Sequence, residues 1–326
     1  MGGNHSGPQT RNKNSHEREA RNFKERTDAH RHADFEEFLQ TLILRTHEAV
    51  RVHRQEVSAF SPDDPISKKR NISEHKERHA RAAFDGLRIA QLSDLHCKEF
   101  GADNTRLYAA VERAAPDLIF LTGDLVDEYA EEPVSYARTV GAALSAIAPT
   151  YFVTGNHEWA QGNAVAEAVK TALSESGVTV LSNEFVPLEQ DGQTIFIAGI
   201  DDPNGYADQL TPAELAQRLY TQYADPFWLL LAHRNNLFNG RYCRLGADLT
   251  FSGHAHGGIW RLPFTDGLLD TNLNWFPSFT SGFYHCTDED CAGAEVFVSR
   301  GLGNSPKWAL RLFNRPQLAV ITLKKG

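Results

Sequence analysis

Seven side chains of the kinds that bind metal ions lie at or just after the ends of short apolar runs. They are Asp94, His96, Asp124, Asn156, His233, His254 and His256. Imidazole and oxygen ligands without a thiolate suit Mn, Fe, Zn, Co or Ni better than a closed structural zinc site. Seven ligands are too many for one ion, whereas two ions about 3.5 to 4 Å apart can share a bridging carboxylate. Such a pair generates hydroxide at neutral pH for in-line attack on phosphorus, so the pattern predicts a dinuclear phosphoester hydrolase.

The elements that would position these side chains alternate between strand and helix. Candidate buried strands are the apolar runs 87–92, 118–121, 151–153, 195–200, 227–232 and 249–251. Helix-like segments lie between several of them, at 104–115, 133–148, 162–176 and 211–223. This alternation predicts the α/β class. Ligands collect beyond the strand ends of open α/β sheets, so neighbouring strands would bring the seven side chains to one rim.

Five short sequence blocks occur in order along this part of the chain: D-x-H, G-D-x-x-D, G-N-H-E, a lone His after a strand, and G-H-x-H. Together they resemble the calcineurin-like metallophosphoesterase family over residues 84–323. The later segment from Val298 to Asn304 and on to Arg315 also resembles a bacterial branch that includes membrane-anchored phosphodiesterases. The resemblance implies a four-layer sandwich of two mixed β-sheets flanked by helices.

The resemblance also implies a role for each ligand. One ion would bind Asp94, His96 and His256, the other would bind Asn156, His233 and His254, and Asp124 would bridge them. His157 would be the catalytic residue, either protonating the leaving oxygen or stabilising charge on the phosphoryl group. Glu158 would orient His157. The sequence departs from the family pattern beside the ligands, at Cys97, Asn235, Asn236, Ile259 and Trp260, and these residues are expected in the pocket wall.

Several other residues keep two interpretations. Arg234 is either a phosphate ligand or a surface ion-pair partner. Asp127 is expected outside the metal ligands, and Asp201 and Asp202 are expected mainly in a turn. The aromatic residues of the site loops could pack locally, stack on a base or hold an acyl chain: Trp159, Trp260, Trp275, Phe276 and Phe279. The four cysteines, Cys97, Cys243, Cys286 and Cys291, are expected to be free thiols.

Charge is distributed unevenly along the chain. Residues 1–83 hold 16 Lys and Arg against 13 Asp and Glu, which leaves 17 against 29, or a net −12, for residues 84–326. An acidic domain argues against a stable nucleic-acid partner, because such binding depends on neutralising phosphates. No apolar stretch has the length of a transmembrane helix and no signal peptide is seen, so a cytoplasmic location is expected.

The first 83 residues read as a polar extension, partly disordered, in front of a catalytic domain at 84–326. Within the extension, residues 35–57 carry apolar side chains at helical spacing, which predicts an amphipathic helix. Such a helix could dock on the domain, contact a partner protein, or lie peripherally on an anionic membrane.

The expected activity is therefore metal-dependent phosphoester hydrolysis, with manganese among the candidate ions and a phosphodiester as the favoured substrate. A monoester or a pyrophosphate remains an alternative. By resemblance to the membrane-anchored branch, a lipid-linked pyrophosphate of the UDP-diacylglucosamine type is a further candidate. A non-catalytic scaffold of the same fold would be expected to have lost ligands, and none is missing here.

Overall fold

The computed structural model describes residues 82–324 apart from 262–265, 271–273, 287–293 and 305–309. By its contacts the chain divides into two compact units, residues 1–68 and 69–326, and all the described residues belong to the second. The amphipathic helix predicted at 35–57 lies outside the described residues. Within the described part of the chain, no helix is both long and apolar enough to cross a membrane.

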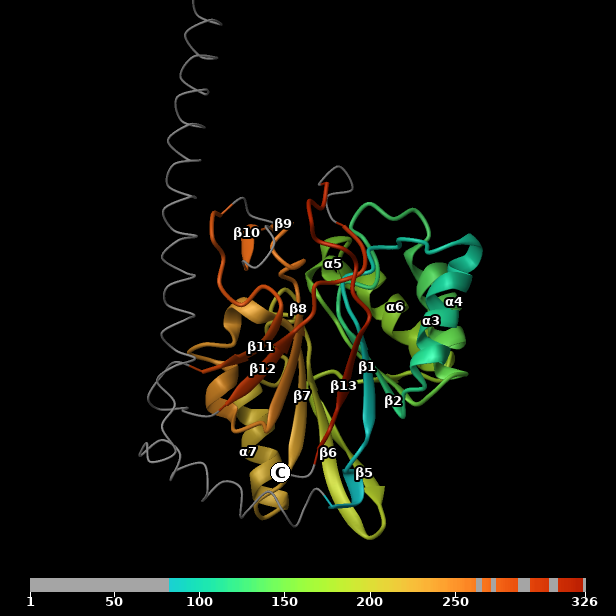
Figure 1. The fold of residues 1–326 in the computed structure, drawn as a ribbon. Coiled ribbons are helices and arrows are strands. Elements are labelled where there is room, and N and C mark those ends of the chain that lie inside the picture. The colour runs from blue at the N-terminus through green and yellow to red at the C-terminus, as the bar shows by residue number, and fades with distance from the viewer. Residues whose placement is uncertain (1–81, 262–265, 271–273, 287–293, 305–309, 325–326) are drawn as a thin grey trace, which may run out of the picture. The chain divides into compact units, whose positions relative to one another are not determined.

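Two mixed β-sheets form the centre of the second unit (Figure 1). The five-stranded sheet has the order β13 (Ala319–Thr322), β1 (Arg88–Leu92), β2 (Leu118–Thr122), β3 (Thr150–Val153) and β4 (Thr179–Val180). The six-stranded sheet has the order β11 (Gly282–His285), β12 (Glu295–Val298), β8 (Leu249–Gly253), β7 (Trp228–Arg234), β6 (Gln193–Ile200) and β5 (Glu184–Gln190). In both sheets the inner strands pair in parallel and an antiparallel strand lies at one or both edges.

Helices cover the outer faces of both sheets. The described α-helices are α3 (Thr105–Ala114), α4 (Pro133–Ser145), α5 (Asn156–Ala160), α6 (Asn163–Glu175) and α7 (Pro212–Gln222). Short 3₁₀ turns span Ala82–Phe84, Ala102–Asn104, Asn235–Leu237 and Tyr242–Leu245, and a two-stranded ribbon pairs β9 (Trp260–Arg261) with β10 (Gly267–Leu269). Helix α7 begins at a proline after Thr211, whose hydroxyl accepts a hydrogen bond from the Glu214 amide, so the predicted helix start is confirmed.

Three hydrophobic cores separate four layers, because successive residues of each inner strand point to opposite faces. Along β7, Leu229 and Leu231 pack in the core between the sheets, which also contains Phe120 of β2. The alternate residues Trp228 and Leu230 pack in a second core, against α7. A third core lies between the five-stranded sheet and helices α3, α4 and α6. The predicted four-layer α/β sandwich is confirmed.

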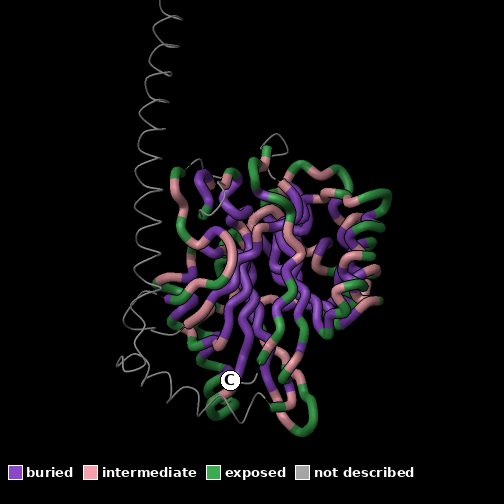
Figure 2. Tube along the Cα trace, viewed as in Figure 1, coloured by how far each residue is buried: buried purple, intermediate pink, exposed green. Residues whose placement is uncertain are grey.

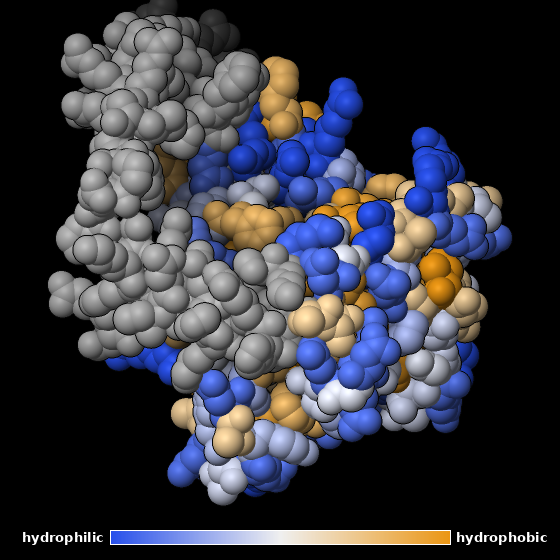
Figure 3. All heavy atoms as spheres, turned by 60° about the horizontal axis from the view of Figure 1, so that its bottom comes forward, coloured by the Kyte–Doolittle hydropathy of each residue, from blue (hydrophilic) through white to orange (hydrophobic). Residues whose placement is uncertain are grey.

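Burial follows this layering. The inner strands are buried along most of their length, whereas the tip of the β5–β6 hairpin and the outer turns of the helices are exposed (Figure 2). At the end of the molecule that faces the viewer in Figure 3, apolar residues form small separate areas among hydrophilic ones.

Candidate metal centre

The carboxyl ends of inner strands from both sheets meet at one rim, near α5 in Figure 1. The rim is joined across the sheets by Gln91 of β1, whose amide nitrogen donates to the Thr122 hydroxyl at 2.9 Å and to the Ser252 carbonyl at 3.0 Å. Because β2 and β8 each end within two residues of these contacts, the loops that follow them emerge side by side. The predicted convergence on one rim therefore has a structural basis.

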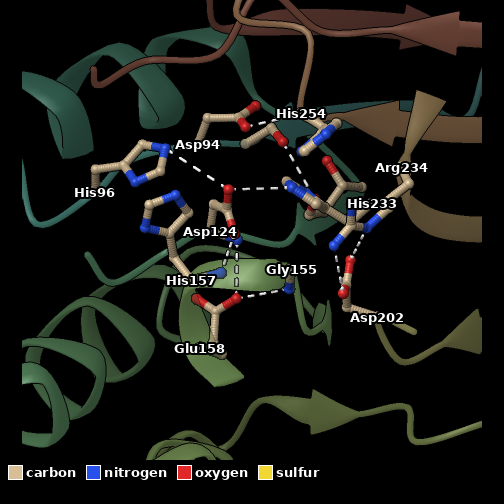
Figure 4. Close-up of polar contacts among 12 residues, drawn as sticks. Asp94, His96, Asp124, Gly155, His157, Glu158, Asp202, His233, Arg234 and His254 are labelled. Carbon is tan, nitrogen blue, oxygen red and sulfur yellow. Dashed lines mark hydrogen bonds and ion pairs between the residues drawn. The ribbon is translucent and has the colours of Figure 1, made fainter. Parts of the chain in front are cut away.

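Six of the seven predicted ligands fall into two groups that share one carboxylate. Within each group the candidate ligand atoms all lie within 4.8 Å of one another. The first group, here named the Asp94 subsite, contains Asp94, His96, Asp124 and His256. The second, named the His233 subsite, contains Asp124, His233 and His254. Figure 4 shows Asp124 at the centre, with His96 and His157 on one side of it and His233 and His254 on the other.

The spacing of the donor atoms fits shared ions. The Nε2 atoms of His96 and His256 are 3.2 Å apart, and Nε2 of His256 is 3.5 Å from Oδ1 of Asp94. Two ligand atoms about 2.1 Å from one ion in a tetrahedral arrangement lie about 3.4 Å apart. Oδ2 of Asp124 lies 3.1 Å from Nε2 of His233 and 3.7 Å from Nε2 of His96. One carboxylate oxygen thus faces a ligand nitrogen of each subsite.

Buried atoms that lack hydrogen-bond partners mark the same place. Among the described residues, Oδ2 of Asp94, Oδ1 of Asn156 and Nε2 of His233 are buried without such a partner. Buried polar atoms are normally satisfied, so each unsatisfied atom needs an explanation. All three belong to predicted ligands, and a bound cation would supply the missing interaction. Asn156, the seventh predicted ligand, is the first residue of α5 and follows directly after β3 and its turn.

The outer ring nitrogens of two histidines are held in the manner typical of metal ligands. Nδ1 of His233 lies 2.8 Å from the Thr122 carbonyl oxygen, to which it can only donate, so Nε2, which faces Asp124, is the nitrogen that the neutral ring offers to an ion. Nδ1 of His96 lies 3.4 Å from Oδ2 of Asp127. A carbonyl or carboxylate in this position fixes the ring and raises its basicity as a ligand. Asp127 therefore lies behind a predicted ligand, outside the two subsites.

The backbone at the rim is held in an unfavourable conformation. Five predicted ligands have positive φ angles: Asp94 (51°), His96 (49°), Asp124 (51°), His254 (68°) and His256 (48°). Non-glycine residues rarely adopt this region, and each instance costs on the order of 1 kcal/mol or more. The neighbouring turn must also contain glycine, because a Cβ on Gly155 would lie 2.2 Å from Oδ1 of Asp124. Packing of the two sheets holds these turns in place.

His157 lies beside both subsites without belonging to either. Its backbone amide donates to Oδ1 of Asp124 at 2.9 Å, and its ring packs edge-on against the ring of His96 at 4.6 Å. Nδ1 of His157 accepts a hydrogen bond from the Glu128 amide at 3.3 Å. A neutral ring that accepts at Nδ1 carries its proton on Nε2. His157 is therefore set up as a hydrogen-bond or proton donor.

Glu158 has a different role from the predicted one. Its carboxylate accepts hydrogen bonds from the amides of Asp124 (3.0 Å), Gly155 (2.6 Å) and Val126 (3.1 Å). These contacts tie the turn after β2 to the turn after β3, and none of them involves His157. The expectation that Glu158 orients His157 is wrong, because the buried carboxylate is fully engaged with backbone donors.

Burial and neighbouring charges raise the pKa values of some groups in the cluster and lower those of others. Burial acts to raise the pKa of Asp124, but His233 and His96 outweigh it and hold that pKa well below its usual range. Burial acts to lower the pKa of His233, but Asp124 overcomes it and raises the pKa to about 10. Burial, together with His233, lowers the pKa of His254 to about 3. Burial and the charge of Asp124 raise the pKa of Glu158 to about 7.

Arg234 is committed to an ion pair with a buried carboxylate. Its Nε and Nη2 atoms donate to Oδ2 and Oδ1 of Asp202 at 2.7 and 3.0 Å. Asp202 also accepts from the Asn204 amide, so the predicted turn is present. Of the two interpretations of Arg234, the ion pair is the one that the contacts match, although its partner is buried and not at the surface.

The aromatic residues and cysteines of the loops differ among themselves. Trp159 is buried and donates to the Thr154 hydroxyl, and Phe279 packs against Phe238, whereas Trp260 and Trp275 are exposed. Cys97 and Cys243 are not disulfide-bonded, in agreement with the prediction. The expectation of a free thiol at Cys286 is wrong, because this residue is disulfide-bonded. Cys291 lies outside the described residues.

Two residues near the centre were not identified from the sequence. Arg311 places Nη2 3.3 Å from Nδ1 of His256, and the Asn314 side chain donates to the His256 carbonyl at 2.6 Å. Both lie in the C-terminal part of the chain, close to the segment that carries the second resemblance. The signal was the basic, acid-free composition of residues 299–326, which contain six Lys and Arg and no Asp or Glu.

The fold and the cluster define a metal-dependent phosphoesterase. A family model described as calcineurin-like phosphoesterase matches residues 87–258, and the chain belongs to that family of phosphoester hydrolases. The metallophosphoesterase YkuE of Bacillus subtilis is 29% identical over 251 residues, which cover 74% of this chain and 80% of that protein. YkoQ of the same organism is 27% identical over 237 residues, covering 71% and 82%.

Solved structures show weaker similarity. The NAD nucleotidase of Haemophilus influenzae has a TM-score of 0.46 and 17% identity, covering 66% of this chain and 45% of that one. A dimetal phosphatase from Danio rerio has a TM-score of 0.40 and 11% identity, covering 67% and 88%. The fold assignment rests on the strand order and on the family match, not on these similarities.

Proposed function

We propose that this phosphoesterase uses two divalent ions, one in each subsite, and that its preferred substrates are phosphodiesters. The observation that supports two ions is the position of Asp124, whose Oδ2 atom faces His96 of one subsite and His233 of the other. Asn156 would complete the His233 subsite. Imidazole and carboxylate donors without thiolate favour manganese, iron, zinc or cobalt over magnesium or calcium.

Two ions held in this way supply an activated water molecule and neutralise charge on the phosphoryl group. The protein's own contribution begins with ligand orientation: the Thr122 carbonyl fixes the ring of His233, and Asp127 fixes that of His96. Burial of both rings keeps bulk water from competing for the same positions. His157 then offers its Nε2 proton to the leaving oxygen.

A preference for diesters follows from the guanidinium groups near the site. A phosphomonoester carries nearly two charges at neutral pH and is commonly bound by a free Arg fork. Within the described part of the chain, two arginines that adjoin or contact predicted ligands use their forks inside the protein: Arg234 binds Asp202, and Arg311 binds the Arg300 and Gly303 carbonyls. A singly charged diester needs less positive charge, so it suits this site better.

The test is hydrolysis of a chromogenic phosphodiester and the matching monoester by metal-stripped protein to which Mn²⁺, Zn²⁺, Co²⁺ or Mg²⁺ is returned. We expect metal-dependent turnover that is faster on the diester and falls about 10³-fold in Asp124→Asn, with bound metal dropping below two ions per chain. Full activity with one ion per chain would contradict the two-ion proposal. Faster turnover of the monoester would contradict the substrate preference.

An amphiphilic, lipid-linked pyrophosphate is a second candidate substrate, favoured by a surface next to the Asp94 subsite. Trp260, Leu310 and Phe313 expose 38%, 74% and 67% of their surface, and the Trp260 indole donates to the Leu310 carbonyl. Exposed aromatic and aliphatic side chains in a basic segment suit an anionic lipid. Phe313→Ser should reduce turnover of a micelle-bound substrate while leaving a soluble diester unaffected; equal effects on both would exclude this candidate.

We also propose, from the sequence alone, a cytoplasmic location with peripheral membrane or protein contact through the predicted helix at 35–57. Removing residues 1–83 should then alter location or assembly. Turnover of a small diester by a folded truncated protein should be unchanged. A non-catalytic scaffold would instead show neither turnover nor bound metal in the full chain.

A further inference from the structure

The segment Ser299–Asn304, here named the strap, lies directly against the first predicted ligand. The amide of Leu302 donates to the Ser93 carbonyl at 3.0 Å, and the amide of Gly303 donates to the Asp94 carbonyl at 2.6 Å. The approach is close enough to require glycine, because a Cβ on Gly301 would lie 2.8 Å from Cβ of Asp94. Gly301 also has a φ of +69°, which a side chain would strain. The strap therefore fixes the backbone of Asp94.

Arg311 fastens the strap in its position. Its Nη1 atom donates to the Arg300 carbonyl at 2.7 Å, Nη2 donates to the Gly303 carbonyl at 2.5 Å, and Nε donates to the Asn304 side chain. One planar guanidinium thus binds three acceptors of one short segment, an arrangement that a lysine cannot reproduce. Burial lowers the pKa of Arg311 to about 10, so the group remains charged at neutral pH.

The same part of the chain also holds His256. Nη2 of Arg311 lies 3.3 Å from Nδ1 of His256, on the side of the ring away from His96. Because a guanidinium can only donate, this contact does not prepare Nε2 of His256 as a ligand, so His256 is supported through its backbone. The Asn314 amide donates to the His256 carbonyl at 2.6 Å and to the Ile259 carbonyl at 3.3 Å. Two ligands of the Asp94 subsite, from different sheets, are therefore positioned by residues that follow the family match at 87–258.

We propose that Arg311 is a positioning residue for the Asp94 subsite and that, through the strap, it sets the affinity of that subsite for its divalent ion. The inference rests on the proposed two-ion function. The ring of His233 is fixed by the Thr122 carbonyl and the turns of its subsite are joined by Glu158, and neither residue belongs to the strap. The His233 subsite is linked to Asp94 through the His254 amide, which donates to Oδ1 of Asp94 at 3.0 Å. Loss of Arg311 should therefore affect mainly the ion of the Asp94 subsite and leave the other bound.

The experiment uses the full chain and measures Mn²⁺ binding by equilibrium dialysis with elemental analysis, together with the electron paramagnetic resonance signal of a coupled Mn²⁺ pair. We expect Arg311→Ala to bind one ion with unchanged affinity and the other 10- to 100-fold more weakly. The coupled signal should vanish at Mn²⁺ concentrations that fill both sites of the unmodified protein. Arg311→Lys should not restore it.

Arg88→Ala is the matched control. Arg88 also uses its guanidinium to bind carbonyls, those of Ala114 and Ala115, but it lies at the opposite end of β1 from Asp94. It should keep both ions. If Arg311→Ala does not fold, Gly301→Ala provides a second disturbance of the strap and should show the same selective loss.

The outcomes separate the two proposals. If the unmodified protein never binds two ions, the two-ion function fails. If it binds two and Arg311→Ala or Gly301→Ala also binds two with unchanged affinities, the positioning role is overturned. Equal weakening of both ions would likewise overturn it, because that result indicates a general loss of structure and not control of one subsite.

Discussion

The two subsites are built from the same kinds of ligand but are held in different ways. In the His233 subsite a backbone group at the end of β2, the Thr122 carbonyl, fixes the ring of His233, and the carboxylate of Glu158 in α5 joins the turns after β2 and β3. In the Asp94 subsite Asp127 lies beside the ring of His96, and Arg311 binds the strap, whose amides hold the backbone of Ser93 and Asp94.

One kind of ligand support therefore comes from the fold itself, and the other comes from a particular side chain of this sequence. Backbone support comes with the packing of the two sheets, since any sequence that places β2 of one sheet against β7 of the other in this way presents the Thr122 carbonyl at that place. Support by Arg311 requires a particular side chain from a segment outside the family match. The Asp94 subsite is thus the one whose metal affinity single substitutions can change most selectively.

The largest expected effect concerns His157, which belongs to neither subsite. His157→Asn should lower kcat for a chromogenic diester by about 10²- to 10³-fold, because general-acid assistance is lost. Both ions should remain bound, as measured by elemental analysis. Loss of an ion in this variant would mean that His157 supports the Asp94 subsite through its contact with His96. His157 would then be one of the side chains that hold this subsite.

Glu158→Gln should disturb the His233 subsite first. The substitution replaces one acceptor oxygen with a donor that faces a backbone amide, at a cost of about 3 kcal/mol in the free energy of unfolding. Denaturant unfolding of metal-free protein measures this loss. Glu167→Gln, on the exposed side of α6, is the control and should change stability by less than about 0.5 kcal/mol. Unchanged stability in Glu158→Gln would show that the three amide contacts contribute little.

Arg234→Met tests whether this residue is structural. Removing the guanidinium leaves the buried Asp202 carboxylate without its ion-pair partner, so we expect a loss of about 2 kcal/mol in unfolding free energy, reduced by the partial exposure of Arg234. KM for a diester should stay within about twofold. A tenfold rise in KM with unchanged stability would instead assign Arg234 to phosphate binding.

The smallest effect is a pH dependence in metal-free protein that differs in sign between His233 and His256. The pKa of His233 is raised to about 10, so its stabilising contribution is complete below pH 6.5 and is lost as pH rises through 10. Burial and His96 lower the pKa of His256, so its contribution is present above pH 6.5 and is lost as pH falls.

The loss of stability at alkaline pH and the loss at acid pH should each change the free energy of unfolding by about 1 kcal/mol, because neighbouring groups titrate together with the two rings. Thermal unfolding of metal-free protein at a series of pH values measures it. His233→Gln should reduce only the loss of stability at alkaline pH, and His256→Gln should reduce only the loss at acid pH. Both losses of stability should become smaller when ions are added, because ligation requires the neutral imidazole.

The sequence predicted the inner strands better than the edges. β1, β2, β3, β6, β7 and β8 were all predicted, because parallel strands buried on both faces form continuous apolar runs. The edge strands β4, β5, β11 and β13 were not predicted, because they are short or half-exposed, and β5 also carries Glu184, Pro187 and Glu189. The inner strand β12 was not predicted either. Helix α5 was also missed, because five residues are too few for a periodic pattern.

By itself the sequence determined which residue types stand at the strand ends, and hence the metal-dependent chemistry and the family. Only the tertiary structure decided how those residues are supported: that Glu158 binds backbone amides and not His157, that Arg234 is taken by Asp202, and that Arg311 reaches His256. The physical reason is the distance along the chain. Ligand identity is a local property of a turn, whereas partners such as His96 and His256, 160 positions apart, meet only when two sheets pack.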